Sequence, residues 1–137
     1  MLKSPRLLFV LTEDWFFCSH FIERARKARD SGYQVAVAAR EGNHREIIQK
    51  DGLEFIHIPL TRKSLNPVTE FFLLIYIFRV YRKFQPDIVH QIGAKPILYG
   101  TVAAYFAGVR AIVNAPIGMG FIFSSDIFLA RLLRPFV

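Results

Sequence analysis

Several residues in the stretch PDIVHQIGAKPILYG are of types that bind or transform ligands. His90 carries an imidazole, which exchanges protons near neutral pH. Gly93 allows a sharp backbone turn, and Lys95 brings a positive charge to the start of the helix-like stretch that follows. We expect His90 to meet a hydroxyl group or a phosphate, with Gly93 and Lys95 beside it. The alternative is a histidine that makes only structural hydrogen bonds within a strand.

The stretch TEDWFFCSH follows the first apolar run and holds a second set of polar residues. Glu13 and Asp14 are metal-ligand types, although acidic residues at the start of a helix are also common without any metal. Ser19 and His20 are expected near the start of the following helix. His20 is therefore a candidate substrate-binding residue, and an ordinary position on a helix surface is the alternative.

Two further stretches are candidates for the same site. PLTRKSLNP places Arg62 and Lys63 before a helix start, where an anion can bind, although a plain capped loop explains it equally well. NAPIGMGF supplies three more candidate substrate-binding residues, Asn114, Gly118 and Gly120. Glycine lets another group approach the backbone closely, but a single G-x-G is a weak signal.

Motifs with strict spacing are absent from the sequence. It contains no G-x-G-x-x-G, no G-x-x-x-x-G-K-[ST] and no H-E-x-x-H, so the fingerprints of dinucleotide binding, of P-loop enzymes and of zinc proteases are missing. Cys18 is the single cysteine, so an internal disulfide is impossible and a cysteine-based zinc site is disfavoured. We therefore predict neither a metal site nor a bound cofactor.

Short apolar runs that alternate with helix-like stretches must position these residues. The apolar runs predict strands at residues 6–12, 33–39, 53–60, 87–92 and 110–116. The other stretches predict helices at residues 18–32, 43–52, 67–84, 95–108 and 127–137. Residues that favour helix starts support three of them, namely Asn43, Asn66 followed by Pro67, and Asp126.

This alternation predicts an α/β fold, a Rossmann-like doubly wound parallel sheet. Strands that are apolar throughout and separated by helices are typical of a parallel sheet covered on both faces. Right-handed crossovers bring the carboxyl ends of all strands to one edge of the sheet. Ligands bind at that edge in such folds, so we expect the candidate residues to gather there.

Length and composition fit one globular domain. The chain has 137 residues, of which 53% are hydrophobic, and 18 Lys and Arg against 11 Asp and Glu give a formal net charge of +7. A basic protein suits phosphate ligands, nucleic acid or an anionic membrane surface. The longest apolar run, Phe71–Phe78, is far shorter than the roughly 20 residues of a spanning helix. We expect a cytoplasmic protein, with peripheral attachment to the inner face of the cytoplasmic membrane left open.

The order and spacing of the motifs resemble a known family. The stretches PDIVHQIGAKPILYG, GVRAIVNAPIGMGFIFSS and LLRPFV are similar to the N-terminal domain of family-4 (group 1) glycosyltransferases of the GT-B type. The head of the chain, LLFVLTEDWFFCSHFIERARKARDSGYQVAVAAR, and the stretch GLEFIHIPLTRKSLNP fit the same pattern. The resemblance covers nearly the whole chain. It implies that residues 1–137 form one domain of a GT-B enzyme and that the C-terminal donor-binding domain is absent.

The resemblance also implies a function. It indicates the acceptor-binding half of a retaining glycosyltransferase that uses a nucleotide-sugar donor, needs no metal, and acts in bacterial polysaccharide or lipid-linked glycan synthesis. The family pattern transfers a catalytic role to His90 and a cleft-lining role to Gly118 and Gly120. It often has a second histidine where Ile92 stands, and another after the fifth strand, where this sequence has NAPIG. Without a donor-binding half, we expect the chain to be inactive.

Two other function classes remain as alternatives. A non-catalytic subunit could recruit a separate donor-binding protein to the membrane, because residues 67–84 are apolar on nearly all sides in their first half and end with Arg79, Arg82 and Lys83 on one face. A response-regulator-like or nucleic-acid-binding module fits the fold and charge alone. The sequence lacks both an alternation of aromatic and basic residues and a complete acidic pocket, so we predict no nucleic-acid partner.

Overall fold

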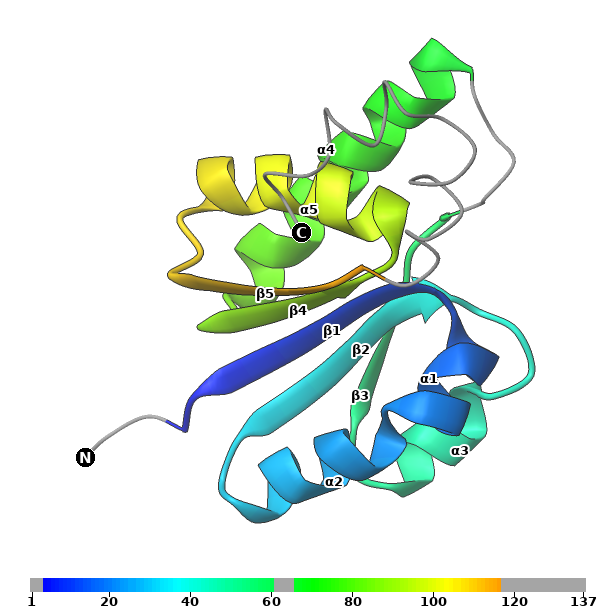
Figure 1. Ribbon diagram of the computed structural model, residues 1–137, viewed down its shortest axis with the longest axis vertical. Coiled ribbons are helices and arrows are strands. Elements are labelled where there is room, and N and C mark those ends of the chain that lie inside the picture. Colours follow the sequence, from blue (N-terminus) through cyan, green and yellow to red (C-terminus); the bar gives the residue numbers. More distant parts are fainter. Residues whose placement is uncertain (1–3, 61–65, 117–137) are drawn as a thin grey trace.

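A computed structural model describes residues 4–60 and 66–116 of the chain. Strands and helices alternate along it as the sequence predicts (Figure 1). In chain order the elements are β1 Arg6–Glu13, α1 Asp14–His20, α2 Ile22–Asp30, β2 Gln34–Arg40, α3 Arg45–Lys50, β3 Glu54–His57, α4 Pro67–Phe84, β4 Ile88–Ile92, α5 Ala94–Ala107 and β5 Ala111–Ala115.

The five strands form one parallel sheet in the order β3-β2-β1-β4-β5. The chain starts in the middle of the sheet, builds outward to β3, then crosses back to β4 through α4. This is the Rossmann-like doubly wound topology that the sequence predicts, and it confirms that all carboxyl ends share one edge. That edge, which we call the carboxyl edge, carries the starts of α1 and α5.

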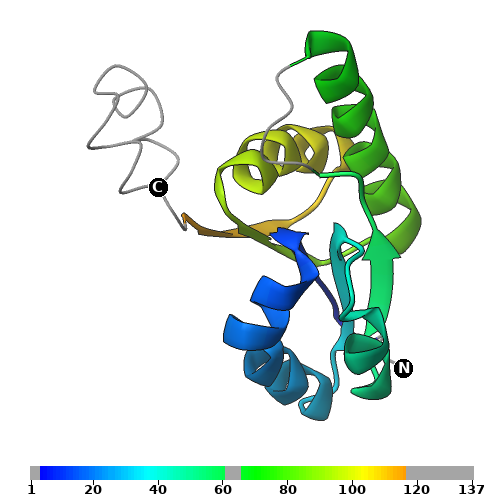
Figure 2. The same cartoon turned by 90° about the vertical axis from the view of Figure 1, so that its right-hand side faces the viewer.

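Side chains alternate between the two faces of the sheet and build a core on each. In β1, Leu8 and Val10 pack toward α4 and α5, whereas Phe9 and Leu11 pack toward α1, α2 and α3. All four side chains are almost completely buried, as expected for a central strand covered on both faces. Figure 2 shows the sheet between the two groups of helices.

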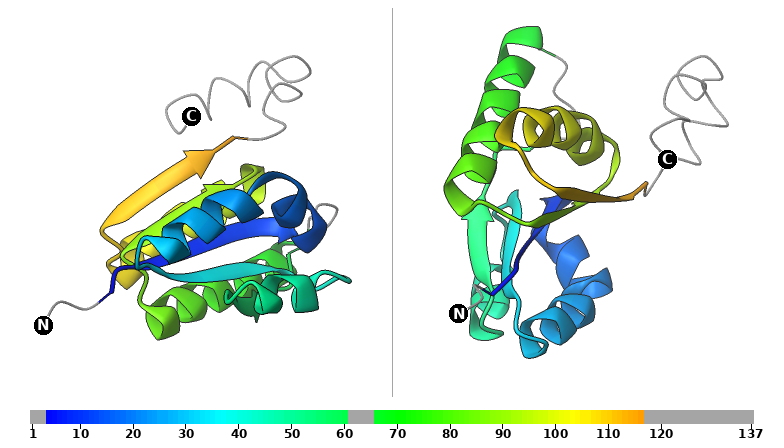
Figure 3. Two further views of the ribbon diagram at one scale, coloured as in Figure 1. Left: turned by 90° about the horizontal axis from the view of Figure 1, so that it is seen from below. Right: turned by 90° about the vertical axis from the view of Figure 1, so that its left-hand side faces the viewer.

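The face that carries α1, α2 and α3 is covered unevenly. These helices lie over β1, β2 and β3, whereas β4 and β5 extend beyond them (Figure 3). Val113 of β5 is accordingly 48% exposed. Ile92 of β4 is still buried with these helices, so within the described residues β5 is the open part of this face.

The predicted start and end of α4 are confirmed. The Asn66 side chain accepts a hydrogen bond of 3.0 Å from the Val68 amide, and Pro67 follows at the first helical position. The helix ends at Phe84; the next residue, Gln85, adopts the left-handed conformation with φ 54°, and Pro86 cannot continue the helix.

Two helix predictions are wrong in detail. The expected single helix at 18–32 is two helices, because the chain breaks at Phe21, whose ring packs into the core beside Phe9. The expected cap at Asn43 is not used, and α3 starts at Arg45. The physical reason is that the buried carboxylate of Asp14 holds the backbone on either side of Asn43, as described below. The expected helix at 127–137 lies outside the described residues.

Candidate functional site

Gly93 forms the corner at the end of β4 as predicted. Its φ of 95° lies in a region that residues other than glycine rarely adopt. Its amide donates a 3.0 Å hydrogen bond to the carbonyl of Ala115, the last residue of β5. The corner therefore ties the ends of two neighbouring strands together at the carboxyl edge and starts α5.

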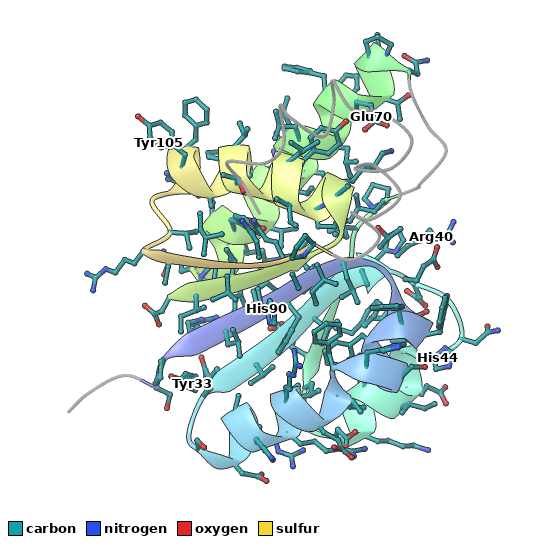
Figure 4. All side chains as sticks on the ribbon, in the orientation of Figure 1. Tyr33, Arg40, His44, Glu70, His90 and Tyr105 are labelled. Atoms are coloured by element: carbon teal, nitrogen blue, oxygen red, sulfur yellow. The ribbon has the colours of Figure 1, made fainter. Side chains whose placement is uncertain are left out.

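His90 lies within β4 and not at its end. It is opposite Phe9 of β1 and Val113 of β5 in the sheet register, and Figure 4 shows it near the middle of the strands' length. Its ring is half-buried, with centroid distances of 5.2 Å to Phe9 and 5.6 Å to Phe21. Burial, and then the positive charge of Arg24, lower the pKa of His90, so its imidazole is neutral at pH 7.

Asn114 lies on the opposite face of the sheet from His90. Its side-chain oxygen accepts a 2.9 Å hydrogen bond from the amide of Gln91, which is completely buried. Gln91 also donates to Thr101 and accepts a 2.9 Å hydrogen bond from the hydroxyl of Tyr81. Asn114 thus belongs to a polar network between β4, β5, α4 and α5, in which buried polar groups satisfy one another.

Gly100 makes room for this network. A β-carbon at position 100 would lie 2.3 Å from Oε1 of Gln91 and 2.8 Å from the hydroxyl oxygen of Tyr81. A β-carbon essentially never lies this close to a non-bonded oxygen atom. Helix α5 can therefore approach β4 this closely only because residue 100 has no side chain.

Lys95 points toward α4. Its ammonium lies 3.1 Å from the carboxylate of Glu70, and both side chains are largely buried. Burial, and then a hydrogen bond to Glu70 and its negative charge, raise the pKa of Tyr99 to about 12. Lys95 and Tyr99 of α5 therefore hold Glu70, in the first turn of α4.

Glu13 and Asp14 are engaged within the protein. Glu13 accepts a 2.6 Å hydrogen bond from Arg40. Asp14 is buried and accepts backbone hydrogen bonds of 2.7 Å from Gly42 and 3.0 Å from His44. Within the described residues, no group of three or more His, Cys, Asp or Glu side chains is arranged to hold a metal ion.

His20 ends the short helix α1, and α2 begins shortly after it at Ile22. Its exposed ring stacks on Phe16, with centroids 4.2 Å apart and an interplanar angle of 15°. Cys18 lies on the same helix, where burial, and then the charge of Asp14, raise the pKa of its thiol. A thiol with a raised pKa is a poor nucleophile at neutral pH.

The predicted site residues fall into two groups. His20 and His90 lie on the side of α1 and α2, whereas Lys95 and Asn114 lie on the side of α4 and α5. Gly93 lies at the edge between them. The remaining candidates, Gly118 and Gly120 as well as Arg62 and Lys63, lie outside the described residues.

Several residues that shape the site are not predicted from the sequence. Gln91 is the centre of the buried polar network and Glu70 holds Lys95. Neither belongs to a motif; the one signal for Gln91 is a polar residue inside an apolar run, next to His90. Trp15 lies in a quoted candidate stretch, but its exposure becomes evident only in the structure.

Comparison with known proteins identifies the family. Residues 6–134 match the family described as Glycosyl transferase 4-like. The chain belongs to this family. The match spans nearly all of the sequence, so it includes the sheet, its carboxyl edge and both groups of candidate residues. A search of curated proteins gives no significant match.

Solved structures with the same fold include glycosyltransferases. A glycosyltransferase from Rickettsia africae superposes with a TM-score of 0.66 at 17% identity, covering 92% of this chain and 35% of that protein. MurG of Acinetobacter baumannii gives 0.65 at 16% identity, covering 88% and 38%. The chain therefore spans little more than a third of these proteins. At such identities the likeness shows a GT-B-type Rossmann-like domain and not an activity.

A structure of another enzyme class has the same fold. UDP-GlcNAc 2-epimerase from Neisseria meningitidis, solved with bound UDP-GlcNAc, gives a TM-score of 0.55 at 14% identity, covering 95% of this chain and 38% of that protein. The fold of this Glycosyl transferase 4-like chain therefore also occurs in an enzyme of another class.

No helix among residues 4–60 and 66–116 is both long and apolar enough to cross a bilayer. The longest is α4, at 18 residues.

Proposed function

We propose that this chain is the acceptor-binding half of a retaining glycosyltransferase that uses a nucleotide-sugar donor. The donor would be bound by a second domain, on the same polypeptide or on a partner. The acceptor would be a sugar or a lipid-linked glycan of bacterial polysaccharide synthesis. The observation that carries the proposal is the match of residues 6–134 to the Glycosyl transferase 4-like family; retention, donor class and pathway come from the family resemblance.

The described geometry supports an acceptor site on the side of His90. On the other face the polar groups near the carboxyl edge are engaged with one another, as Gln91 with Asn114 and Lys95 with Glu70. His90 instead lies half-buried beside Val113 of β5, which is exposed among the described residues. A neutral imidazole can accept a proton from a sugar hydroxyl. We therefore assign the catalytic contact with the acceptor to His90.

The test compares the 137-residue chain with a complete enzyme that includes a donor-binding half. Radiolabelled nucleotide sugars are offered with lipid-linked and free glycan acceptors. We expect transfer by the complete enzyme and none by the chain alone. In the complete enzyme, His90→Ala should reduce transfer without lowering the melting temperature by a comparable degree. Transfer by the 137-residue chain alone, or full transfer by the His90→Ala enzyme, would contradict the proposal.

A second candidate function, recruitment to a membrane, is favoured by an apolar surface on α4 and α5. Leu74, Ile75, Phe78, Val102, Ala103 and Phe106 line an open groove of about 230 Å³ between the two helices. Phe71 and Phe72 are 59% and 64% exposed, and Figure 4 shows Tyr105 on the outer side of α5. Exposed aromatic residues near basic ones are typical of surfaces that contact anionic membranes.

Vesicle flotation tests this second function. The chain should float with vesicles that contain phosphatidylglycerol and stay in solution with phosphatidylcholine vesicles, and added salt should weaken the binding. Phe71→Ser and Phe72→Ser should reduce flotation, whereas Ile47→Ser on the exposed side of α3 serves as the control. Absence of flotation at low salt would exclude membrane recruitment by this surface.

A further inference from the structure

We propose that Trp15, Phe16 and His20 form an aromatic platform that binds an uncharged sugar ring of the acceptor. This inference rests on the proposed function and specifies where and how the acceptor is held. The three residues lie on α1, which starts directly at the carboxyl end of β1. They are called the α1 platform below.

The rings of the α1 platform are arranged face to face and edge to face. Phe16 and His20 stack with centroids 4.2 Å apart, and Trp15 meets Phe16 at 5.6 Å with an interplanar angle of 75°. Residues 16 and 20 are one helical turn apart, so their rings share a face of α1. The platform is therefore an ordered surface, because each ring restricts the orientation of the next.

Phe16 packs partly against the core, but packing of α1 does not explain the exposure of Trp15 and His20. The helix is anchored by Phe17, which is completely buried in the core, and by the buried carboxylate of Asp14. Trp15 is 46% exposed, and His20 is exposed as well. Contiguous aromatic surface left open to water costs free energy, and it commonly marks a binding site.

The charged groups next to the α1 platform are consistent with an uncharged ligand. The nearest carboxylates in the sequence, Glu13 and Asp14, are engaged by Arg40 and by backbone amides. The three platform residues include no Lys, Arg, Asp or Glu, and the nearby guanidinium of Arg24, 5.1 Å from the centroid of the Phe21 ring, can donate hydrogen bonds to sugar hydroxyl groups. Apolar C–H faces of a pyranose ring pack on aromatic rings, and an imidazole nitrogen can hydrogen-bond a hydroxyl group. A neutral sugar matches both features.

The α1 platform is connected to His90 through one further ring. Phe21 lies 6.1 Å from Phe16 and 5.6 Å from His90, measured between ring centroids. A sugar on the platform would therefore lie on the same side of the sheet as the residue to which we assign the catalytic contact.

The single tryptophan of the chain makes the test direct, because Trp15 is the only source of indole fluorescence. The 137-residue chain is titrated with the methyl α- and β-pyranosides of glucose, galactose, mannose and N-acetylglucosamine. At least one should change the emission of Trp15 in a saturable way. Phe16→Ala and His20→Ala should each weaken that binding about tenfold, which is about 1.4 kcal/mol.

Three controls keep the outcome decisive. Phe72→Ala, which removes an exposed ring on α4, should leave glycoside binding unchanged, and circular dichroism should show every variant folded. Acrylamide should quench Trp15; protection would mean that another part of the chain covers the platform and would overturn the proposal. Saturation by uridine monophosphate or by phospholipid vesicles without binding of any glycoside would also overturn it.

The α1 platform and the proposed function can fail separately. If the complete enzyme transfers sugar and Trp15→Ala leaves the KM for the acceptor unchanged, the platform is wrong and the function stands. If glycosides bind at Trp15 but no complete enzyme transfers sugar, the chain is a carbohydrate-binding domain and the glycosyltransferase assignment is wrong.

Discussion

At the scale of single residues, the environment of His90 determines both its protonation and its candidate role. Its ring is enclosed by Phe9 and Phe21 and lies near the positive charge of Arg24. Both influences disfavour the imidazolium ion. The sequence places a histidine in a predicted strand, but it does not indicate which aromatic rings surround that histidine, since Phe21 comes from the break between two helices that the sequence does not reveal.

The lowered pKa of His90 leads to a prediction on stability. Because the folded state binds a proton on His90 less readily than the unfolded state, the unfolded state takes up more protons below the ordinary histidine pKa of about 6.5. The contribution of neutral His90 to stability is therefore complete above that pH and is lost as the pH falls through the folded-state pKa. Denaturant unfolding between pH 7.5 and pH 5 should show this loss.

The matched variant for this experiment is His90→Gln, which keeps a polar side chain without a titrating group in this range. Its free energy of unfolding should fall less steeply with decreasing pH than that of the unmodified chain. Equal pH dependence in both proteins would show that His90 does not titrate abnormally.

At the scale of elements, α5 illustrates a contact that depends on a missing side chain. Helix propensity alone predicts that Gly100→Ala stabilises α5 by about 1 kcal/mol. The structure predicts the opposite, because the new methyl group would overlap Gln91 and Tyr81. Overpacking of this kind costs roughly 1–3 kcal/mol, so we expect a net loss of stability in urea unfolding.

A double-mutant cycle separates the two effects in α5. In a Gln91→Ala background, the closest overlap is removed and the cost of Gly100→Ala should shrink. If Gly100→Ala is equally destabilising in both backgrounds, the effect does not arise from contact with Gln91.

Element boundaries are predictable where a local signal decides them. Asn66-Pro67 and Gln85-Pro86 mark the ends of α4 because a cap and an imino acid act within a few residues. The start of α3 is not predictable in this way. Its position depends on hydrogen bonds from Gly42 and His44 to Asp14, which is distant in sequence, and a local pattern contains no information about such a partner.

At the scale of the whole molecule, the sheet order produces a gradient of burial. β1 has strand neighbours on both sides and helices on both faces, and Leu8 through Leu11 are almost inaccessible. In the described part of the chain β5 has a neighbour on one side only, and Ile112 and Val113 are 38% and 48% exposed. The parallel doubly wound topology itself was predictable, since continuous apolar runs and intervening helices admit few other arrangements.

This gradient predicts the order of amide hydrogen exchange. Amides of β1 should exchange only when the whole domain unfolds. Amides of β5 should exchange through local opening, which has a lower free energy. Native-state exchange followed by NMR measures both sets in one experiment. Exchange in β5 as slow as in β1 would mean that β5 is held by contacts other than those described.

The sequence predicts that the candidate residues lie at one edge of the sheet, but not which face of the sheet each of them points to. That parallel strands end together follows from topology, and Gly93 is found at the corner as expected. That His90 and Asn114 point to opposite faces follows from the register of two neighbouring strands. Such registers are set by the packing of the whole core. The ligand-binding roles of His20, His90, Lys95 and Asn114 stay predictions.

The hydrogen bond between the side chains of Gln91 and Asn114 affects which substitutions this domain can accept during evolution. The sequence of a strand with a neighbour on one side usually varies freely. Here the side chain of Asn114 in β5 also bonds to the buried Gln91 of β4, in addition to the backbone hydrogen bonds between the two strands. Because Gln91 also accepts a hydrogen bond from the buried hydroxyl of Tyr81, substitutions at Gln91 should persist in descendants only when both Asn114 and Tyr81 change too, for example to apolar residues of similar volume.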